Sequence, residues 1–96
     1  MKRMNIKQLK IQLRSIKSVK SIQKETIYHS IKVKKDKLEF CRGLSKKKEN
    51  ILIEELLNFF NNKEGVNTVI AKKYISGRVQ SPAVAIINEL KNKIKK

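Results

Sequence analysis

The chain runs without a glycine or proline until Gly43, and this uninterrupted stretch is the feature that most limits how it folds. Within it, apolar residues recur at intervals of three, four and three positions: Ile6, Leu9, Leu13 and Ile16. The stripe continues, with some drift, through Val19, Ile22, Ile27, Ile31, Leu38 and Cys41. This spacing is the repeat of one helix face, and a narrow stripe of this length is typical of a coiled coil. We therefore predict a single long helix within residues 1–44.

The remainder of the chain predicts shorter helices. Gly43 suits the left-handed residue that ends a helix, and residues 49–61 (ENILIEELLNFFN) have the pattern of a strongly apolar helix. Residues 66–75 (VNTVIAKKYI) fit a helix or a short strand, and we favour the helix because no strand is evident to pair with it. The dipeptide Ser81-Pro82 is typical of a helix start and precedes the last apolar segment.

Glycine and proline are scarce in the whole chain, with three and one respectively, and this favours helices over turn-rich sheets. The predicted fold class is therefore all-α. A long N-terminal helix is expected to pair with a C-terminal helix as an antiparallel coiled coil, with a short helical segment between them. The predicted parts are residues 1–44, a connector over residues 45–76, and residues 77–96.

The net charge of +16 is concentrated in the N-terminal half. Residues 1–48 contain sixteen Lys and Arg against three acidic residues, whereas residues 49–96 contain eight against five. A helix this basic repels itself unless an acidic partner surrounds it. Nucleic acid, an anionic membrane and an acidic protein collar all fit this charge, and composition does not choose among them.

Patterns of catalytic or metal-binding residues are not evident. His29 is the only histidine and Cys41 the only cysteine, so neither a metal site nor an internal disulfide is expected. There is no Ser-His-Asp set, no paired carboxylates for acid–base work and no phosphate-cradling glycine loop. We expect this chain to have no catalytic activity and no cofactor. It has no apolar run of about 18 residues and no signal peptide, so we predict a cytoplasmic protein with only indirect membrane contact.

One stretch matches a known pattern. Residues 16–20 read I-K-S-V-K, and Gln23, Lys24 and Thr26 follow. This resembles the first helix of the γ subunit, the rotor of F1-type ATP synthases, which typically reads R-I-x-S-V-K-N-T-Q-K-I-T. Glu25 stands where the family has isoleucine. Near the other end, the AVAIINEL segment that closes with Leu90 is partly similar to the family's last helix.

The resemblance implies a central-stalk subunit that transmits rotation coupled to ATP hydrolysis or synthesis. Its partners would be the α- and β-type nucleotide-binding subunits of an F1-like hexamer, together with other small stalk subunits. The ring would contact six polar residues, which are Lys17, Lys20, Gln23, Lys24, Thr26 and Glu89. The coiled-coil seam would be formed by Ile6, Leu9, Leu13, Ile16, Ile86 and Leu90. The chain is too short for the family's α/β head domain, so the resemblance also implies a specialised motor for motility or surface machinery.

Two other functions stay open at this point. The first is a small basic nucleic-acid-binding protein, because the lysines are numerous enough for strong, salt-dependent contact with phosphates. Against it, the sequence lacks helix-turn-helix spacing, zinc ligands and the aromatic motifs of RNA-binding sheets, and nucleic acid is therefore not the partner that we expect first. The second is a coiled-coil adaptor.

Overall fold

The computed structural model describes residues 4–20, 26–44 and 46–94, and it shows an α/β fold in place of the predicted all-α fold. An antiparallel sheet of four strands is present in the described residues. The elements follow in this order: α1 (Ile6–Arg14), β1 (Ser18–Lys20), β2 (Ile27–Val33), β3 (Lys37–Arg42), β4 (Lys48–Leu52), α2 (Ile53–Asn61), α3 (Thr68–Tyr74) and α4 (Gln80–Ile94).

The predicted long N-terminal helix is wrong beyond Arg14. Helix α1 ends there, and the Ser15 hydroxyl donates a 2.6 Å hydrogen bond to the carbonyl oxygen of Gln12, so this side chain satisfies one of the last carbonyls of the helix. The residues that follow alternate between two sheet faces. In β3, Leu38 and Phe40 are buried whereas Lys37 is exposed, which is the two-residue period of a strand. The apolar stripe drifts because the spacing of apolar residues changes from the helical repeat of α1 to the two-residue repeat of the strands.

The sheet is a meander in which each strand pairs with the next one along the chain, in the order β1-β2-β3-β4. The β2–β3 turn is closed by a 2.8 Å hydrogen bond from the Lys34 N–H to the Lys37 carbonyl. The β3–β4 turn starts at Gly43, whose φ of +57° favours glycine. The hairpin between β3 and β4 runs across the predicted boundary between residues 1–44 and 45–76.

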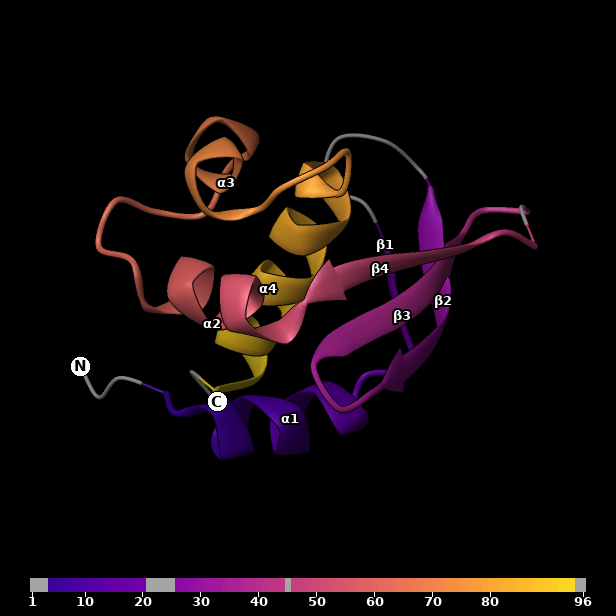
Figure 1. Cartoon of the computed structure of the whole chain (residues 1–96), viewed down its shortest axis with the longest axis horizontal. Helices are drawn as coiled ribbons and strands as arrows, with labels where there is room; N and C mark the ends of the chain where they lie inside the picture. Colours follow the sequence, from indigo (N-terminus) through magenta and orange to yellow (C-terminus); the bar gives the residue numbers. More distant parts are fainter. Residues whose placement is uncertain (1–3, 21–25, 45, 95–96) are drawn as a thin grey trace.

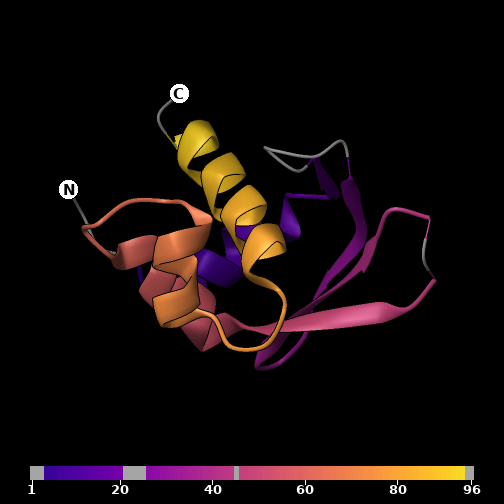
Figure 2. The same ribbon diagram turned by 90° about the horizontal axis from the view of Figure 1, so that it is seen from above.

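The helices form a layer on one side of the sheet (Figures 1 and 2). Helices α1, α2 and α4 contact the strands, and α3 packs on α2 and α4. A common core joins the two layers. It includes Leu9, Leu13, Ile16, Tyr28, Leu38, Phe40, Ile51, Leu56, Phe59, Ile86 and Leu90. Burial of each large apolar side chain contributes about 1.5–3 kcal/mol, so this core is the main source of stability.

Five of the six predicted seam residues lie in this core: Leu9, Leu13, Ile16, Ile86 and Leu90. They pack with the sheet and with α2, not in a seam between two helices, because the strands occupy the place where a coiled coil would continue. Ile6, the sixth, is exposed.

Helix boundaries follow from local hydrogen bonds. Helix α1 begins with a capping box, in which the Gln8 N–H donates to the Asn5 side chain and the Asn5 N–H donates to the Gln8 side chain. Helix α2 begins directly after β4, with no residue between Leu52 and Ile53. The Ile53 N–H donates to the carbonyl of Asp36 at 3.0 Å, which ties the start of α2 to the β2–β3 turn.

The predictions for the shorter helices are partly confirmed. The ambiguous segment 66–75 contains α3, so the choice of a helix is confirmed there. The last helix is also present, as α4. The helix predicted over residues 49–61 starts later than expected, because residues 48–52 pair with β3 and form β4.

Candidate nucleic-acid interface

In the part of the chain that the structure describes, the helices cover one face of the sheet and leave the other face open (Figure 2). Side chains opposite one another in paired strands share a face. Cys41 is opposite both His29 and Lys48, and Glu39 is opposite Lys32. Leu38 and Phe40 point into the core, so Glu39 and Cys41, which alternate with them, point to the open face. The residues opposite Glu39 and Cys41 in the neighbouring strands share that face.

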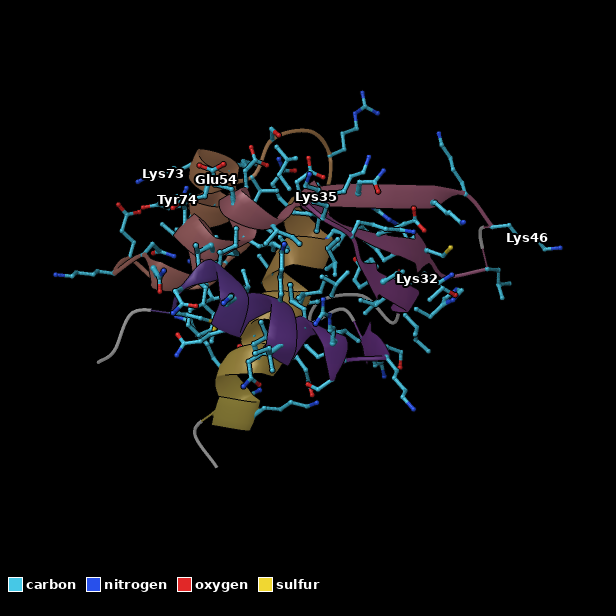
Figure 3. All side chains as sticks on the ribbon, turned by 60° about the horizontal axis from the view of Figure 1, so that its bottom comes forward. Lys32, Lys35, Lys46, Glu54, Lys73 and Tyr74 are labelled. Carbon is cyan, nitrogen blue, oxygen red and sulfur yellow. The ribbon has the colours of Figure 1, made fainter. Side chains whose placement is uncertain are left out.

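Lysines are prominent on this half of the molecule. The described residues within 17–48, which contain the three strands β1 to β3 and the start of β4, hold ten Lys and Arg against two acidic residues. Figure 3 shows Lys32 and Lys46 on the half formed by the sheet, whereas Lys73 lies on the helical half. On that helical half, Lys73 donates a 2.9 Å hydrogen bond to the Glu64 carboxylate, and this bond raises the pKa of Lys73.

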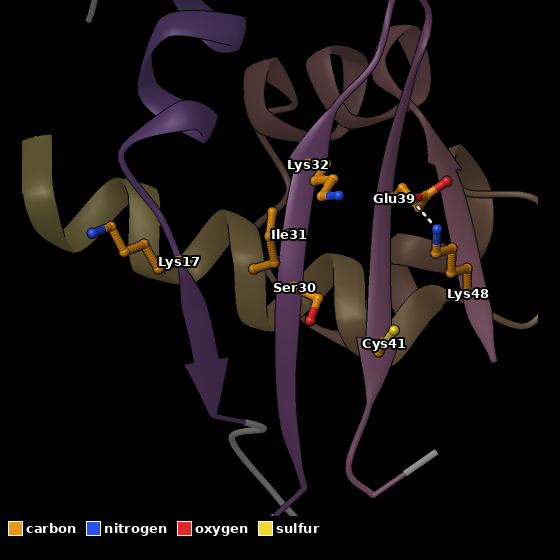
Figure 4. A pocket seen from close by; sticks show the side chains of 7 residues that line it. All are labelled: Lys17, Ser30, Ile31, Lys32, Glu39, Cys41 and Lys48. Atoms are coloured by element: carbon orange, nitrogen blue, oxygen red, sulfur yellow. Dashed lines mark ion pairs between the residues drawn. The ribbon is translucent and has the colours of Figure 1, made fainter. Parts of the chain in front are cut away.

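A hollow of about 420 Å³ lies on the open face (Figure 4). It is lined by Lys17, Ser30, Ile31, Lys32, Glu39, Cys41 and Lys48. The strand register shifts between His29 and Lys32, and Ser30 has a φ of 55°. A bulge of this kind bends a strand and increases its twist, so the irregularity in β2 helps to shape the hollow.

The hollow is electrostatically positive. Its one acidic side chain, Glu39, is paired with Lys48 at 3.6 Å between Oε1 and Nζ. The Lys48 side chain is exposed, and such a pair contributes little to stability because water screens it. Lys17 and Lys32 are exposed and line the same hollow. Two positive charges therefore remain after the Glu39–Lys48 pair is counted.

Further lysines extend the positive surface at both ends of the strands. Lys34 and Lys35 are exposed in the β2–β3 turn, and Lys46 is exposed in the β3–β4 turn. The Lys10 ammonium donates a 2.6 Å hydrogen bond to the Lys35 carbonyl, which places a cation of α1 beside the first of these turns. The positive surface is therefore longer than the hollow itself.

The predicted ring contacts are only partly brought together. Lys17 lines the hollow, Lys20 ends β1, and Thr26 directly precedes β2. Glu89 lies in α4, within the helical layer. Gln23 and Lys24 lie outside the described residues.

Lys32 and Lys48 were not predicted as members of one site, because Lys32 falls in the predicted long helix and Lys48 in the predicted connector over residues 45–76. His29 and Cys41 were likewise read as helix residues. The alternation of Lys37-Leu38-Glu39-Phe40 could have indicated a strand there, with Glu39 and Cys41 on one face, but it carries no information on Lys32 or Lys48.

Chemical alternatives at the site are few. Among the described residues, no group of three or more His, Cys, Asp or Glu side chains could hold a metal ion. The described helices are all too short or too polar to cross a membrane. Comparisons with protein-family models, with curated proteins and with solved structures found no match. The geometry and charge of the open sheet face are therefore the features that bear on function.

Proposed function

We propose that this chain binds nucleic acid through phosphate contacts made by the open face of its sheet. The observation that carries the proposal is the arrangement of Lys17, Lys32 and Lys48 around one hollow on a face without a covering helix in the described residues. Clustered lysines neutralise backbone phosphates and release the counterions around them, which favours binding. Such contacts fix position without reading base sequence, so the expected binding is largely independent of sequence.

The geometry favours this function over the rotor, whose assignment stays an untested prediction. An axle requires a continuous helix through residues 16–26, whereas the described part of this stretch contains the strand β1. A coiled-coil adaptor needs a helix of the same kind. Nucleic-acid binding needs only an accessible cationic face. The free thiol of Cys41 is compatible with the predicted cytoplasmic location, where thiols stay reduced.

The test is a salt titration with two matched variants. We expect Lys17→Gln with Lys32→Gln to weaken binding to a fluorescent DNA duplex, because two phosphate contacts are removed. A plot of log affinity against log salt concentration should become shallower by about 2, since each phosphate-binding lysine contributes about 1 to the slope. Fluorescence anisotropy at several NaCl concentrations measures both quantities.

The control is Lys63→Gln with Lys72→Gln, which removes the same charge from exposed positions in the helical part of the molecule. This control should keep a slope close to that of the unchanged chain. Equal losses in the two double variants would show that net charge alone drives association, and the sheet face would then have no special role.

A further inference from the structure

The β3–β4 turn presents an unusual apolar residue. Leu44 is fully exposed to solvent, more than any other large apolar side chain among the described residues. The hairpin that carries it projects away from the helical layer in both views of the fold (Figures 1 and 2). A leucine in this position contributes nothing to the core, so its side chain is free to contact a ligand.

The residue before Leu44 is fixed to β2 at two points. The Gly43 N–H donates a 2.8 Å hydrogen bond to the carbonyl of Ile27. The Gly43 carbonyl lies 2.7 Å from Nε2 of His29, and because a carbonyl only accepts, His29 must donate through Nε2. The other ring nitrogen, Nδ1, lies 3.0 Å from the Ser30 hydroxyl. These contacts hold the base of the turn in one position.

The hairpin below the turn is also held firmly. Arg42 makes two hydrogen bonds of 3.0 Å to the Glu49 carboxylate across the β3–β4 pair. A bidentate pair of this type restricts both side chains. Leu44 therefore directly follows two residues, Arg42 and Gly43, that hydrogen bonds tie to the neighbouring strands.

The surroundings of Leu44 are cationic. Lys46 is exposed in the same turn, and Lys48 begins the next strand. Ile27, which the Gly43 hydrogen bond brings to the same end of the sheet, is also half-exposed. An apolar tip with lysines beside it matches two features of a DNA groove, namely phosphates along its edges and, between base pairs that are pushed apart, apolar base faces.

We propose that Leu44 enters a DNA duplex from the minor groove as an apolar wedge, partly unstacking one base step and bending the duplex. This inference rests on the proposed function and adds a second contact to it. The lysines of the sheet bind phosphates, and the leucine deforms the bases between them. Leucine is among the side chains that act as wedges in minor-groove proteins. Flexible steps such as TA are deformed most easily, and duplex RNA, with its shallow minor groove, is a poorer fit.

The experiment measures bending and unstacking separately from affinity. A duplex with a central TA step carries a donor and an acceptor dye at its ends and 2-aminopurine at the step. Each chain is added at saturating concentration, and Leu44→Ala is compared with Ile11→Ala, which shortens another exposed aliphatic residue, on α1. Circular dichroism checks that both variants are folded.

We expect Leu44→Ala to lose most of the change in energy transfer and in 2-aminopurine fluorescence, while Ile11→Ala keeps both. The affinity of Leu44→Ala should fall by about tenfold, the loss expected for removing most of a leucine from an apolar site, and its salt slope should not change. Unchanged bending and fluorescence in Leu44→Ala would overturn the wedge and leave the proposed function intact. Leu44-dependent binding to vesicles of anionic lipid, without bending of DNA, would overturn it in favour of a membrane contact. Absence of duplex binding by the unchanged chain would refute the proposed function itself.

Discussion

At the scale of single residues, Phe40 connects the sheet to the helices. Its side chain is fully buried, and its ring meets Tyr28 edge-on, with 5.8 Å between the ring centres and 89° between the planes. Such edge-to-face pairs add about 0.5–1.5 kcal/mol beyond the burial of area. The neighbour Cys41 lies on the opposite face and lines the hollow. Phe40 and Leu38 therefore mark the side of β3 that faces the core, and Glu39 and Cys41 mark the side that faces the hollow.

We expect Phe40→Ala to lower the free energy of unfolding by about 3–5 kcal/mol, the usual loss for a phenylalanine removed from a packed core. This is a large part of the roughly 5–15 kcal/mol that stabilises a typical domain. Urea denaturation followed by circular dichroism measures the change. Phe60→Ala, at a partly buried position of α2, should cost clearly less, and equal losses would contradict the assigned layering.

Phe40 also shows why part of the fold could not be predicted. Leu38 and Cys41 are three residues apart and fit a helix face, and only Phe40 between them fits the period of a strand. The burial of Leu9, Leu13 and Ile16 could be predicted because the spacing is the same for any helix with one buried face. The site could not be predicted from the sequence, because Lys32 and Lys48 are brought together only by the pairing of strands. That pairing depends on contacts between residues far apart in the chain.

At the scale of elements, the ends of the described helices follow from local hydrogen bonds, whereas Gly43, predicted to end a helix, lies in a turn between two strands. Helix α1 begins at its Asn5 capping box and ends where the Ser15 hydroxyl bonds back to Gln12. The dipeptide Ser81-Pro82 predicts the last helix, although α4 begins earlier, at Gln80, and Pro82 lies in its first turn, where its missing N–H is not needed. Capping residues act through neighbours within four positions, so a sequence can reveal them without knowledge of the fold.

We expect Asn5→Ala to lower the free energy of unfolding by about 0.5–2 kcal/mol, because the Gln8 N–H loses its acceptor at the start of α1. Thermal or urea denaturation provides the measurement. Asn58→Ala is the matched control at an exposed position inside α2. It should stabilise the chain slightly, since alanine has the higher helix propensity. A loss of stability for both variants would argue against the capping role of Asn5.

At the scale of the whole molecule, the excess of positive charge in the N-terminal half could be predicted from the sequence. The surface on which the lysines lie could not. Residues 1–48 have a net charge of +13 from sixteen basic and three acidic residues, and an acidic partner was expected for that reason. That partner is predicted around a long helix, whereas the structure places Lys17, Lys32 and Lys48 around a hollow on a sheet face. Net charge indicates the chemistry of a partner and carries no information about fold.

We expect NaCl to stabilise the free protein while it weakens binding to nucleic acid. The net charge of +16 produces self-repulsion in the compact state, and ions at about 0.5 M screen it more strongly than ions at about 0.05 M. The melting temperature should therefore rise by a few degrees over this range, and the Lys17→Gln, Lys32→Gln variant should gain less. A melting temperature that falls with NaCl would show that favourable ion pairs outweigh the repulsion.

The direct passage from β4 into α2 has a mechanical consequence. Leu52 ends the strand and Ile53 begins the helix, and the Ile53 N–H is bonded to Asp36 in the turn of the neighbouring hairpin. Because no loop lies between them to absorb a displacement, we expect a movement of β4 to be passed on to the start of α2. A ligand that shifts β4 through Lys48 on the open face should therefore also shift α2 on the opposite side of the sheet.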